Sequence, residues 1–194
     1  MEALQAIMTR RSNRRFSSVL PEKEKIETII EAGRQAPCGS NSQSTHFIVI
    51  TNKDVLNDLS LIAGEEFSKM DVKEDTYVSL RNSILASKRG DYVFHYGAPV
   101  LIVTANKKGY GNAMADSACA LENMMIAANA LNMASCYINQ LHWLSDNERI
   151  LAYMNGIGLK DDEFITGALS FGFAEGELIQ KEKKITGNPV SFVE

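Results

Sequence analysis

The sequence predicts an α+β fold, and three observations indicate it. The chain has 194 residues and 45% hydrophobic content, enough to bury one core, so we expect a single domain over residues 1–194. Short apolar runs bounded by polar turns predict strands at 46–51, 100–105 and 165–173. Longer segments with apolar residues at helical spacing separate these runs. The chain therefore carries a small sheet with more helix than strand around it.

The first half of the chain predicts helices at four places. Apolar residues at helical spacing mark them, and Pro21 with acidic residues after it is typical of a helix start. The helix that begins there ends before Pro37, because the residue preceding a proline avoids helical backbone. The expected helices span residues 2–9, 21–36, 54–67 and 76–89, and the strand 46–51 follows the second of them.

Residues 112–132 predict the longest helix. It is apolar over more than one stripe, so we expect it at the centre of the molecule or at a subunit interface. Met124 and Met125 are interpreted as packing, because methionine usually fills gaps in a core. Gly109-Tyr110-Gly111 matches only half of a dinucleotide-binding fingerprint and is interpreted as a turn. The expected apolar face comprises Ala118, Leu121, Met125, Ala128 and Leu131.

The last part of the chain predicts a short helix and a strand without a neighbour. Residues 145–155 form the helix, with Ser145 as its cap and Glu148 at capping-box spacing. Residues 190–193 alternate like a half-buried strand, yet no hairpin partner precedes them. A frayed tail is the alternative, but it would leave three large apolar side chains exposed. We therefore expect this strand to pair elsewhere.

Charge and cysteine content narrow the classes of function. A net charge of -4 argues against nonspecific nucleic-acid binding, which needs an extended positive surface. The three cysteines show no Cys-x-x-Cys spacing, which fits a reducing cytoplasm. The sequence shows neither a secretory leader nor an apolar run of membrane-spanning length, so neither export nor a membrane is expected. The expected partners are small molecules.

Two polar segments are the best candidates for a binding site. Arg10-Arg11-Ser12-Asn13-Arg14 offers planar guanidinium donors and a hydroxyl, a set that suits phosphate oxygens. The segment from Pro37 to Gln43 offers side-chain amides that could bind the polar edge of a ring. On residue types alone, the first segment fits a solvated basic arm as well, and the second an ordinary helix-to-strand turn.

Neither metal binding nor side-chain nucleophilic catalysis is indicated. The three histidines, His46, His95 and His142, show no metal-ligand spacing with Cys, Asp or Glu, so no metal site is expected. The sequence contains no Gly-x-Ser-x-Gly elbow, and Cys136 is interpreted as a small buried thiol. We expect no catalytic side chain. Such a sequence fits a protein whose cofactor carries the chemistry.

The two polar segments belong to a longer pattern. Arg-Arg-Ser-x-Arg-x-Phe from Arg10 to Phe16, and Ala-Pro-x-x-x-Asn-x-Gln from Ala36 to Gln43 with the strand after it, resemble the FMN-dependent nitroreductase family. Later parts of the chain resemble the same family: Tyr96 to Pro99, the helix from Asp116, the segment Ser135 to Ile138, and Gly172-Phe173 with the basic stretch after it. The resemblance spans nearly the whole chain.

The resemblance implies a three-layer α/β/α fold with a mixed, largely antiparallel sheet. It also implies a homodimer that forms through the long apolar helix. In this homodimer the C-terminal strand would cross to the partner's sheet, which would explain the orphan strand at 190–193. The active sites would lie at the subunit interface.

The resemblance also implies contacts to FMN. A cation near N1 and C2=O of the isoalloxazine stabilises negative charge in the reduced ring, which is the place implied for Arg14. Ile138 and Asn139 would place a main-chain N–H near flavin N5. The phosphate would be held by Arg10, Arg11, Ser12 and one lysine of 181–184, for which we choose Lys183. The other subunit would contribute Pro37, Cys38, Gly39, Asn41 and Gln43.

Two departures from the family pattern affect this site. Ser44-Thr45 replaces a common Pro-Trp, and Asn139-Gln140 stands where glycine or an acidic residue is usual beside N5. Glycine suits that place because the backbone must come close to the ring. Asparagine tolerates left-handed backbone better than most residues. We therefore expect the fold to survive, and substrate access or redox tuning to differ.

The implied function is that of an FMN-dependent NAD(P)H oxidoreductase. NADH or NADPH would reduce the flavin and leave, and a nitroaromatic, quinone or similar acceptor would then take the electrons at the same face, in a ping-pong sequence. The same fold hosts reductive dehalogenation and flavin destruction. Outside enzymes, a non-catalytic dimeric flavin-binding or regulatory module is the alternative. A nucleic-acid module based on residues 10–15 fits less well, given the net acidity.

Overall fold

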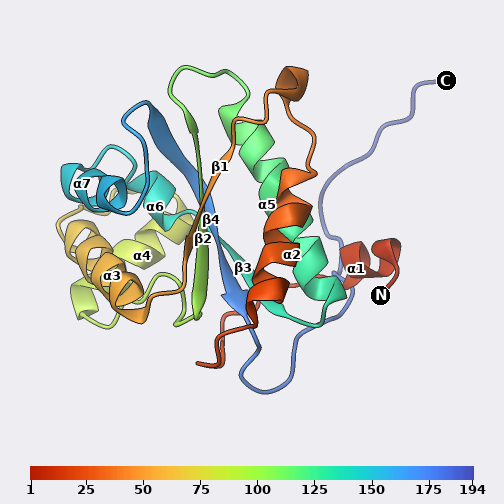
Figure 1. Ribbon diagram of the computed structural model, residues 1–194, viewed down its shortest axis with the longest axis horizontal. Coiled ribbons are helices and arrows are strands. Elements are labelled where there is room, and N and C mark those ends of the chain that lie inside the picture. Colours follow the sequence, from red (N-terminus) through yellow and green to blue (C-terminus); the bar gives the residue numbers. More distant parts are fainter.

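A four-stranded antiparallel sheet forms the centre of the molecule (Figure 1). The computed structural model describes residues 1–194. The strand order is β1-β2-β4-β3, and every neighbouring pair is antiparallel. This confirms the predicted α+β class with a largely antiparallel sheet. The strands are β1 (His46–Ile50), β2 (Val100–Lys107), β3 (Ala134–Ile138) and β4 (Glu163–Gly172).

Helices cover both faces of the sheet and give the predicted α/β/α layering (Figure 1). All the helices expected from periodicity are present, and a short additional helix, α6, follows β3. One layer contains α3 (Lys53–Ser68), α4 (Val78–Arg89), α6 (Gln140–Trp143) and α7 (Glu148–Gly156). The other contains α1 (Ala3–Thr9), α2 (Lys23–Arg34) and α5 (Ala113–Ala130), and a 3-10 turn, Gly39–Asn41, lies between α2 and β1.

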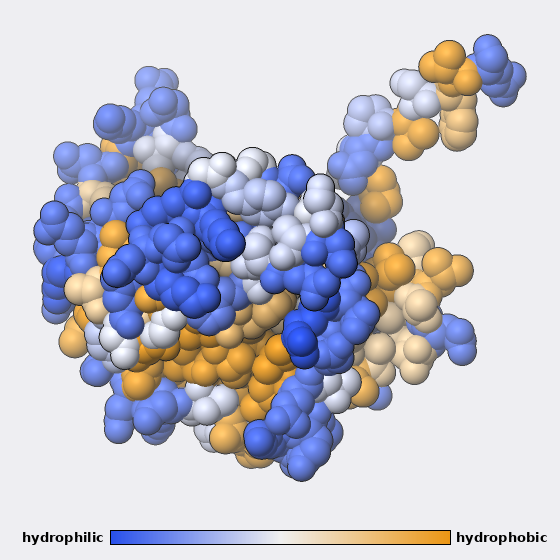
Figure 2. Space-filling model, turned by 45° about the horizontal axis from the view of Figure 1, so that its top comes forward, coloured by the Kyte–Doolittle hydropathy of each residue, from blue (hydrophilic) through white to orange (hydrophobic).

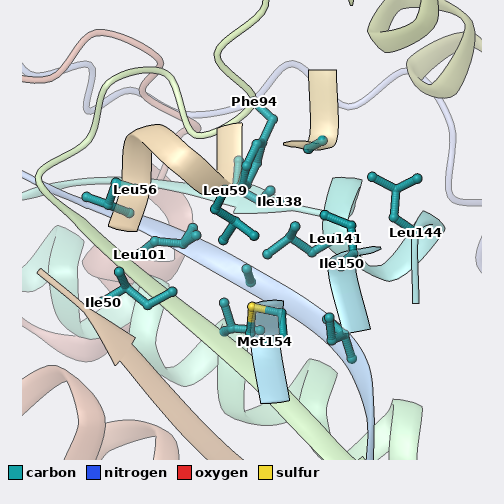
Figure 3. Close-up of a cluster of buried hydrophobic side chains, with 14 of the residues drawn as sticks. Ile50, Leu56, Leu59, Phe94, Leu101, Ile138, Leu141, Leu144, Ile150 and Met154 are labelled. Carbon is teal, nitrogen blue, oxygen red and sulfur yellow. The ribbon is translucent and has the colours of Figure 1, made fainter. Parts of the chain in front are cut away.

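Each face of the sheet carries its own hydrophobic core. The larger core joins the sheet to α3, α4, α6 and α7, and Figure 3 shows its side chains meeting between these elements. It contains 23 buried residues, against 11 in the core between the sheet, α2 and α5. Fully burying a Leu, Ile or Phe side chain stabilises a fold by about 1.5–3 kcal/mol. Most of this stabilisation therefore lies on the α3 side.

The two central strands are buried on both faces, which explains their sequences. Every residue of β2 from Val100 to Asn106 is buried, so this strand is nearly continuous in apolar residues. Its buried Thr104 is hydrogen-bonded to β4, because the hydroxyl of Thr166 donates to the Thr104 carbonyl at 2.9 Å. Buried hydroxyls are tolerated when hydrogen-bonded in this way.

Asparagine caps begin two of the helices in the α3 layer. The side chain of Asn52 accepts the N–H groups of residues 54 and 55 at the start of α3. At α7 the cap is Asn147, whose side chain accepts the N–H groups of residues 149 and 150. The prediction of Ser145 as the cap was therefore wrong. Asn and Ser are equally good caps, so composition could not choose between them.

The long helix α5 has one face against the sheet and α2 and another face outward. Met124 and Met125 are buried, which confirms them as packing residues. A Cβ at Gly33 of α2 would lie 2.9 Å from Met124 Cγ, so the glycine permits close helix packing. Of the expected apolar face, Leu121, Met125 and Ala128 are buried within the chain, whereas Ala118 and Leu131 are exposed on it. Neither α5 nor any other helix is long and apolar enough to cross a membrane.

The C-terminal segment leaves the body of the molecule. It has neither helix nor strand after β4 and extends away from α1 (Figure 1). Val190, Phe192 and Val193 are 75%, 88% and 98% exposed. In the space-filling view the segment stands clear of the surface with its hydrophobic residues uncovered (Figure 2). The strand expected at 190–193 thus has no pairing partner within its own chain.

Candidate functional site

Asn13 anchors the basic segment 10–14, which follows α1, to the edge strand of the sheet by hydrogen bonds. Its main-chain N–H donates to the Ser135 carbonyl in β3 at 2.9 Å. Its buried side chain donates to the Arg11 carbonyl at 3.0 Å and accepts the Ile179 N–H at 3.1 Å. Two of these hydrogen bonds join the segment to distant parts of the chain, at Ser135 and Ile179, and the third holds its own turn at Arg11. The segment is therefore an ordered part of the fold, and its interpretation as a solvated basic arm is wrong.

The chain after β4 runs antiparallel beside the same segment. The Glu175 N–H donates to the Arg15 carbonyl, and the Lys181 N–H donates to the Thr9 carbonyl, each at 3.1 Å. These contacts bring the basic stretch 181–184 next to the first arginines of the chain. Lys183 lies two residues past the last of these contacts and is exposed, so its ammonium group is free to reach a ligand.

Arg10 and Arg11 present guanidinium groups at this junction. Arg10 Nε lies 3.4 Å from a carboxylate oxygen of Glu122 in α5. Arg11 Nη1 donates to the carbonyls of Arg10 and Met8. Arg11 Nη2 is buried without a hydrogen-bond partner, which is costly for a cationic donor. Two guanidinium groups, one with an unused buried donor, beside the Ser12 hydroxyl are a donor set that fits a phosphate.

Arg14, Tyr96 and Cys136 lie next to this donor set. The Arg14 guanidinium is 5.8 Å from the centroid of the Tyr96 ring, within the range of cation–π contact. Tyr96 has a φ of 58°, a left-handed conformation that a residue with a Cβ keeps only when its surroundings hold it. Burial raises the pKa of the Cys136 thiol, against the opposing influence of Arg14 and Ser12. The thiol is neutral and buried, as predicted.

The end of β3 lies beside this group. Cys136, which lies close to Ser12 and within the electrostatic influence of Arg14, precedes Ile138 by two residues in the same strand, or about 7 Å. Ile138 is buried, and Asn139 forms the corner between β3 and α6. The Asn139 N–H donates to Oε1 of Gln140 at 3.1 Å. The structure therefore places residues 10–12 and 14 beside the edge strand β3, and residues 138 and 139 lie at the C-terminal end of the same strand.

The loop from Pro37 to Gln43 has a strained backbone. Ser40, Asn41 and Gln43 have left-handed φ values of 51°, 53° and 47°. Such values are uncommon outside glycine and cluster at functional sites. Pro37, Asn41 and Gln43 are exposed. Beneath the loop, between α2, β1 and α5, lies a cavity of about 350 Å³ that Cys38, Asn41 and Gln43 help to line.

Asp116 and Tyr110 hold this loop in place. Both carboxylate oxygens of Asp116 accept the Gly39 N–H, at 3.1 and 3.2 Å, and one also accepts the Tyr110 hydroxyl at 2.9 Å. A Cβ at Gly39 would lie 2.6 Å from the Tyr110 hydroxyl and 2.2 Å from the Asn112 amide, so a larger residue would displace the ends of these two side chains. The loop conformation is therefore fixed by α5 and the turn before it.

The loop 37–43 and the basic segment 10–14 lie at opposite ends of the folded molecule (Figure 1). The loop is tethered to the first turn of α5 through Asp116, whereas α1 is bonded to its last turn through Asn129, which donates to the Ala6 carbonyl. Thirteen residues of helix separate these anchors by about 20 Å. One chain alone therefore does not bring the two predicted halves of the site together.

The three histidines lie apart. His46 Nδ1 is 2.8 Å from the buried carboxylate of Glu163, and His142 Nδ1 is 2.8 Å from the Ile165 carbonyl. His95 is buried in the loop before β2, and burial lowers the pKa of its imidazole. No group of three or more His, Cys, Asp or Glu side chains is placed to hold a metal ion.

Four residues of the site were missed in the sequence. Asn13 stands at a position that the family pattern leaves open, and nothing in its neighbours marks it as an anchor. Asp116 and Tyr110 act on a loop more than 65 residues away, a pairing that no local pattern reveals. Gln140 was noted only as a departure from the pattern. Neither the burial of these side chains nor the strain of the loop can be read from the sequence.

Comparison with known proteins agrees with this geometry. A nitroreductase from Bacteroides fragilis, solved with bound FMN, is 32% identical and superposes with a TM-score of 0.87 over 100% of both chains. A nitroreductase with bound FMN from Desulfitobacterium hafniense, at 24% identity and a TM-score of 0.83 over 100% of both chains, shares the fold.

A sequence relative and a family model complete the comparison. A protein of Archaeoglobus fulgidus, provisionally named NADH dehydrogenase/NAD(P)H nitroreductase, is 27% identical over 180 residues, which are 91% of this chain and 87% of that protein. The model of the nitroreductase family matches residues 7–173, which include the basic segment, the strained loop and all four strands. The chain therefore belongs to the nitroreductase family.

Proposed function

We propose that this protein is an FMN-dependent NAD(P)H oxidoreductase that works as a homodimer. The observation that carries the proposal is the junction of the basic segment 10–14, the stretch 181–184 and the end of β3. This junction joins a phosphate-type donor set to a strand end in a fold that an FMN-bound nitroreductase shares at 32% identity. The name of the Archaeoglobus fulgidus relative supports a nicotinamide as the electron donor.

The cofactor phosphate would bind where the basic segment meets the C-terminal stretch. Arg10, Arg11 and Ser12 supply guanidinium and hydroxyl donors, and Lys183 adds an ammonium group from the crossing chain. Bidentate guanidinium contacts to phosphate are among the strong charge-assisted hydrogen bonds. Arg11 Nη2 gains the acceptor that the protein itself does not offer. This binding would fix the cofactor at one end.

The ring would then extend toward Arg14 and the corner at Asn139. FMN, when bound, supplies hydride transfer at its N5 atom. Arg14 would place a positive charge beside the pyrimidine edge, which favours the form of the ring with negative charge at N1 and C2=O. Ile138 and Asn139 would align the backbone beside N5. The protein thus positions and tunes the ring, and no side chain is required as an acid or nucleophile.

A second copy of the chain would complete the site. The loop residues lie too far from the basic segment of their own chain, so we assign them to the ring bound by the other copy. They are Pro37, Cys38, Gly39, Asn41 and Gln43.

Two surfaces of the chain suit assembly into a dimer. The outer face of α5 exposes small and apolar side chains, among them Met114, Ala118 and Cys119, and the extended tail exposes the alternating residues 190–193. Pairing the tail with the second copy's sheet would cover its apolar side chains.

Donor and acceptor would use the same open face of the ring in turn. NADH or NADPH would deliver the electrons and leave before a nitroaromatic, quinone or similar acceptor binds. Stacking over a flat ring needs few dedicated side chains, which suits a broad range of acceptors. The loop 37–43 offers amides and hydroxyls rather than a closed pocket, which supports this reading.

The test is the visible spectrum of the purified protein with excess FMN, recorded without oxygen. We expect a bound-flavin spectrum that bleaches when NADH or NADPH is added and returns when a nitroaromatic or quinone follows. Absence of bound flavin would contradict the proposal. A bound flavin that neither nicotinamide bleaches would instead favour the non-catalytic flavin-binding module.

A further inference from the structure

A buried chain of hydrogen bonds leads from the corner at Asn139 into the α3 layer. The Asn139 N–H donates to Oε1 of Gln140 at 3.1 Å, and Nε2 of Gln140 donates to the Ser83 hydroxyl at 3.4 Å. The Ser83 oxygen lies 2.6 Å from the Tyr92 hydroxyl. Gln140 and Ser83 are only 8% and 2% exposed. The chain therefore connects β3, α6, α4 and the loop before β2.

The donors and acceptors in this chain can be assigned from their chemistry. Ser83 donates its one proton to the Ser79 carbonyl at 3.1 Å, so its oxygen must accept from both Tyr92 and Gln140. A main-chain N–H can only donate, so the oxygen of the Gln140 amide must face Asn139. Gln140 and Tyr92 thus both donate to the Ser83 oxygen, and the Gln140 amide has a single orientation that satisfies its neighbours.

Packing holds the far end of the chain rigid. The ring of Tyr92 meets the ring of Phe67 in α3 edge to face, with centroids 6.1 Å apart. Phe67 is fully buried in the larger core. Movement of the Gln140 amide would therefore leave a buried serine or tyrosine hydroxyl with poorer hydrogen bonding, which is unfavourable.

We propose that Gln140 is a positioning residue that competes with the flavin ring for the Asn139 N–H. This inference rests on the proposed function, because it needs the ring beside Asn139. A main-chain N–H carries one proton, and Gln140 Oε1 already accepts it. The oxidised ring has an acceptor lone pair at N5, whereas the reduced ring carries hydrogen there and cannot accept. Gln140 thus weakens a contact that only the oxidised form could make.

The sign of the effect follows. Without the Gln140 oxygen, the Asn139 N–H is free for oxidised FMN, which should bind more tightly while reduced FMN is unaffected. A typical hydrogen bond corresponds to a change of about 2- to 10-fold in a dissociation constant. Because tighter binding of the oxidised form makes reduction harder, the potential of the bound flavin should fall, by about 30 mV for a tenfold change in a two-electron couple.

The experiment compares two substitutions that act in opposite directions. Gln140→Leu removes the acceptor, so oxidised FMN should bind about 2- to 10-fold more tightly and the potential should fall. Gln140→Glu keeps an acceptor on the Asn139 N–H and adds negative charge, so oxidised FMN should bind more weakly than in the unaltered protein, and the reduced ring with its negative charge should lose affinity as well. General damage to the fold would weaken binding in both variants. Asn123→Leu, which removes a side-chain amide hydrogen bond between α5 and the Ala32 carbonyl of α2 on the opposite face of the sheet, is the matched control and should leave the potential unchanged.

The amide resonance of Asn139 gives a readout that does not depend on FMN. In the apo-protein, Gln140→Leu should speed exchange of the Asn139 amide proton with solvent, because the proton has lost its acceptor. Suppose that the unaltered protein binds FMN. If Gln140→Leu then leaves unchanged either the exchange of the Asn139 amide proton or the potential and affinity of the flavin, the inference is overturned and the proposed function stands. Failure of the unaltered protein to bind FMN would overturn both.

Discussion

At the scale of single residues, Asn13 is the anchor on which the proposed phosphate site depends. Its side chain satisfies the Arg11 carbonyl and the Ile179 N–H inside the protein. Replacement by alanine leaves both groups without a partner, and each buried unsatisfied group costs about 1–3 kcal/mol. We expect Asn13→Ala to lower the free energy of unfolding by about 2 kcal/mol or more in urea titrations. Asn155→Ala, at an exposed amide, is the control, and an equal effect there would contradict the role of Asn13.

Lys183 can be tested against its neighbours in the same stretch. Replacing Lys181, Lys183 or Lys184 by alanine removes one positive charge in each case. We expect only Lys183→Ala to weaken FMN binding substantially. The loss should be about tenfold, as for one charge-assisted hydrogen bond. Isothermal titration with FMN and with riboflavin separates the phosphate from the ring. Riboflavin binding should not change in any variant. A loss of the same size for riboflavin would show that Lys183 does not act on the phosphate.

Glu66 predicts a pH dependence of stability. Lys69 at 2.6 Å, Arg149 at 2.7 Å and Asn147 at 2.9 Å hold the pKa of this carboxyl at about 2, below its ordinary 4.5. Because the folded pKa is lowered, the stabilisation is present above pH 4.5 and is lost as the pH falls toward 2. Glu66→Gln should reduce the pH dependence of the unfolding midpoint in that window. Glu27→Gln, at an exposed ion pair in α2, should not, and a matching effect there would contradict the assignment.

These residue-scale results show where sequence reasoning succeeds and fails. The residues that the family resemblance named at 10–12, 14, 138 and 139 all lie along the edge strand β3, because a motif fixes both residue type and place. Asn13 and Asp116 were missed, because their partners lie more than 70 residues away in the chain. Hydrogen bonds over such separations leave no periodic signal in the sequence.

At the scale of elements, α5 is the feature with the most to test. Its inner face packs on the sheet and α2, and its outer face exposes Ala118 and Cys119. If two copies meet through this outer face, a large charge there must be buried without a partner. We expect Ala118→Arg to shift the protein from dimer to monomer in sedimentation velocity. Leu61→Arg, at a 64% exposed leucine in α3, should leave the dimer intact, and dissociation by both variants or by neither would contradict the assignment.

Most element boundaries followed from periodicity, and the exceptions have physical reasons. The strands β1, β2 and β4 and the longer helices were predicted because each has a buried face that the spacing of apolar residues reveals, whereas β3 was named only as a segment of the family resemblance. The four-residue helix α6 was missed because it is barely one turn long. The helix α7 begins later than predicted because Asn147, and not Ser145, satisfies its first N–H groups.

At the scale of the whole molecule, the separation of the two half-sites is the central fact. The strained loop is held at one end of α5 and the basic segment at the other, while the tail extends beyond its own fold. In the proposed dimer, the second copy would bring the loop to the basic segment and would cover the tail. Sequence alone could predict this only through the family resemblance, because neither spacing nor composition encodes which chain supplies a loop.

The most direct test of this account is sedimentation velocity of the protein with FMN, followed at a wavelength that only the flavin absorbs. We predict that the flavin sediments with a species of twice the mass of one chain, at one flavin per chain, and that Ala118→Arg releases it. Flavin that sediments with a single chain, or that stays free beside a dimer, would contradict a site built from two copies.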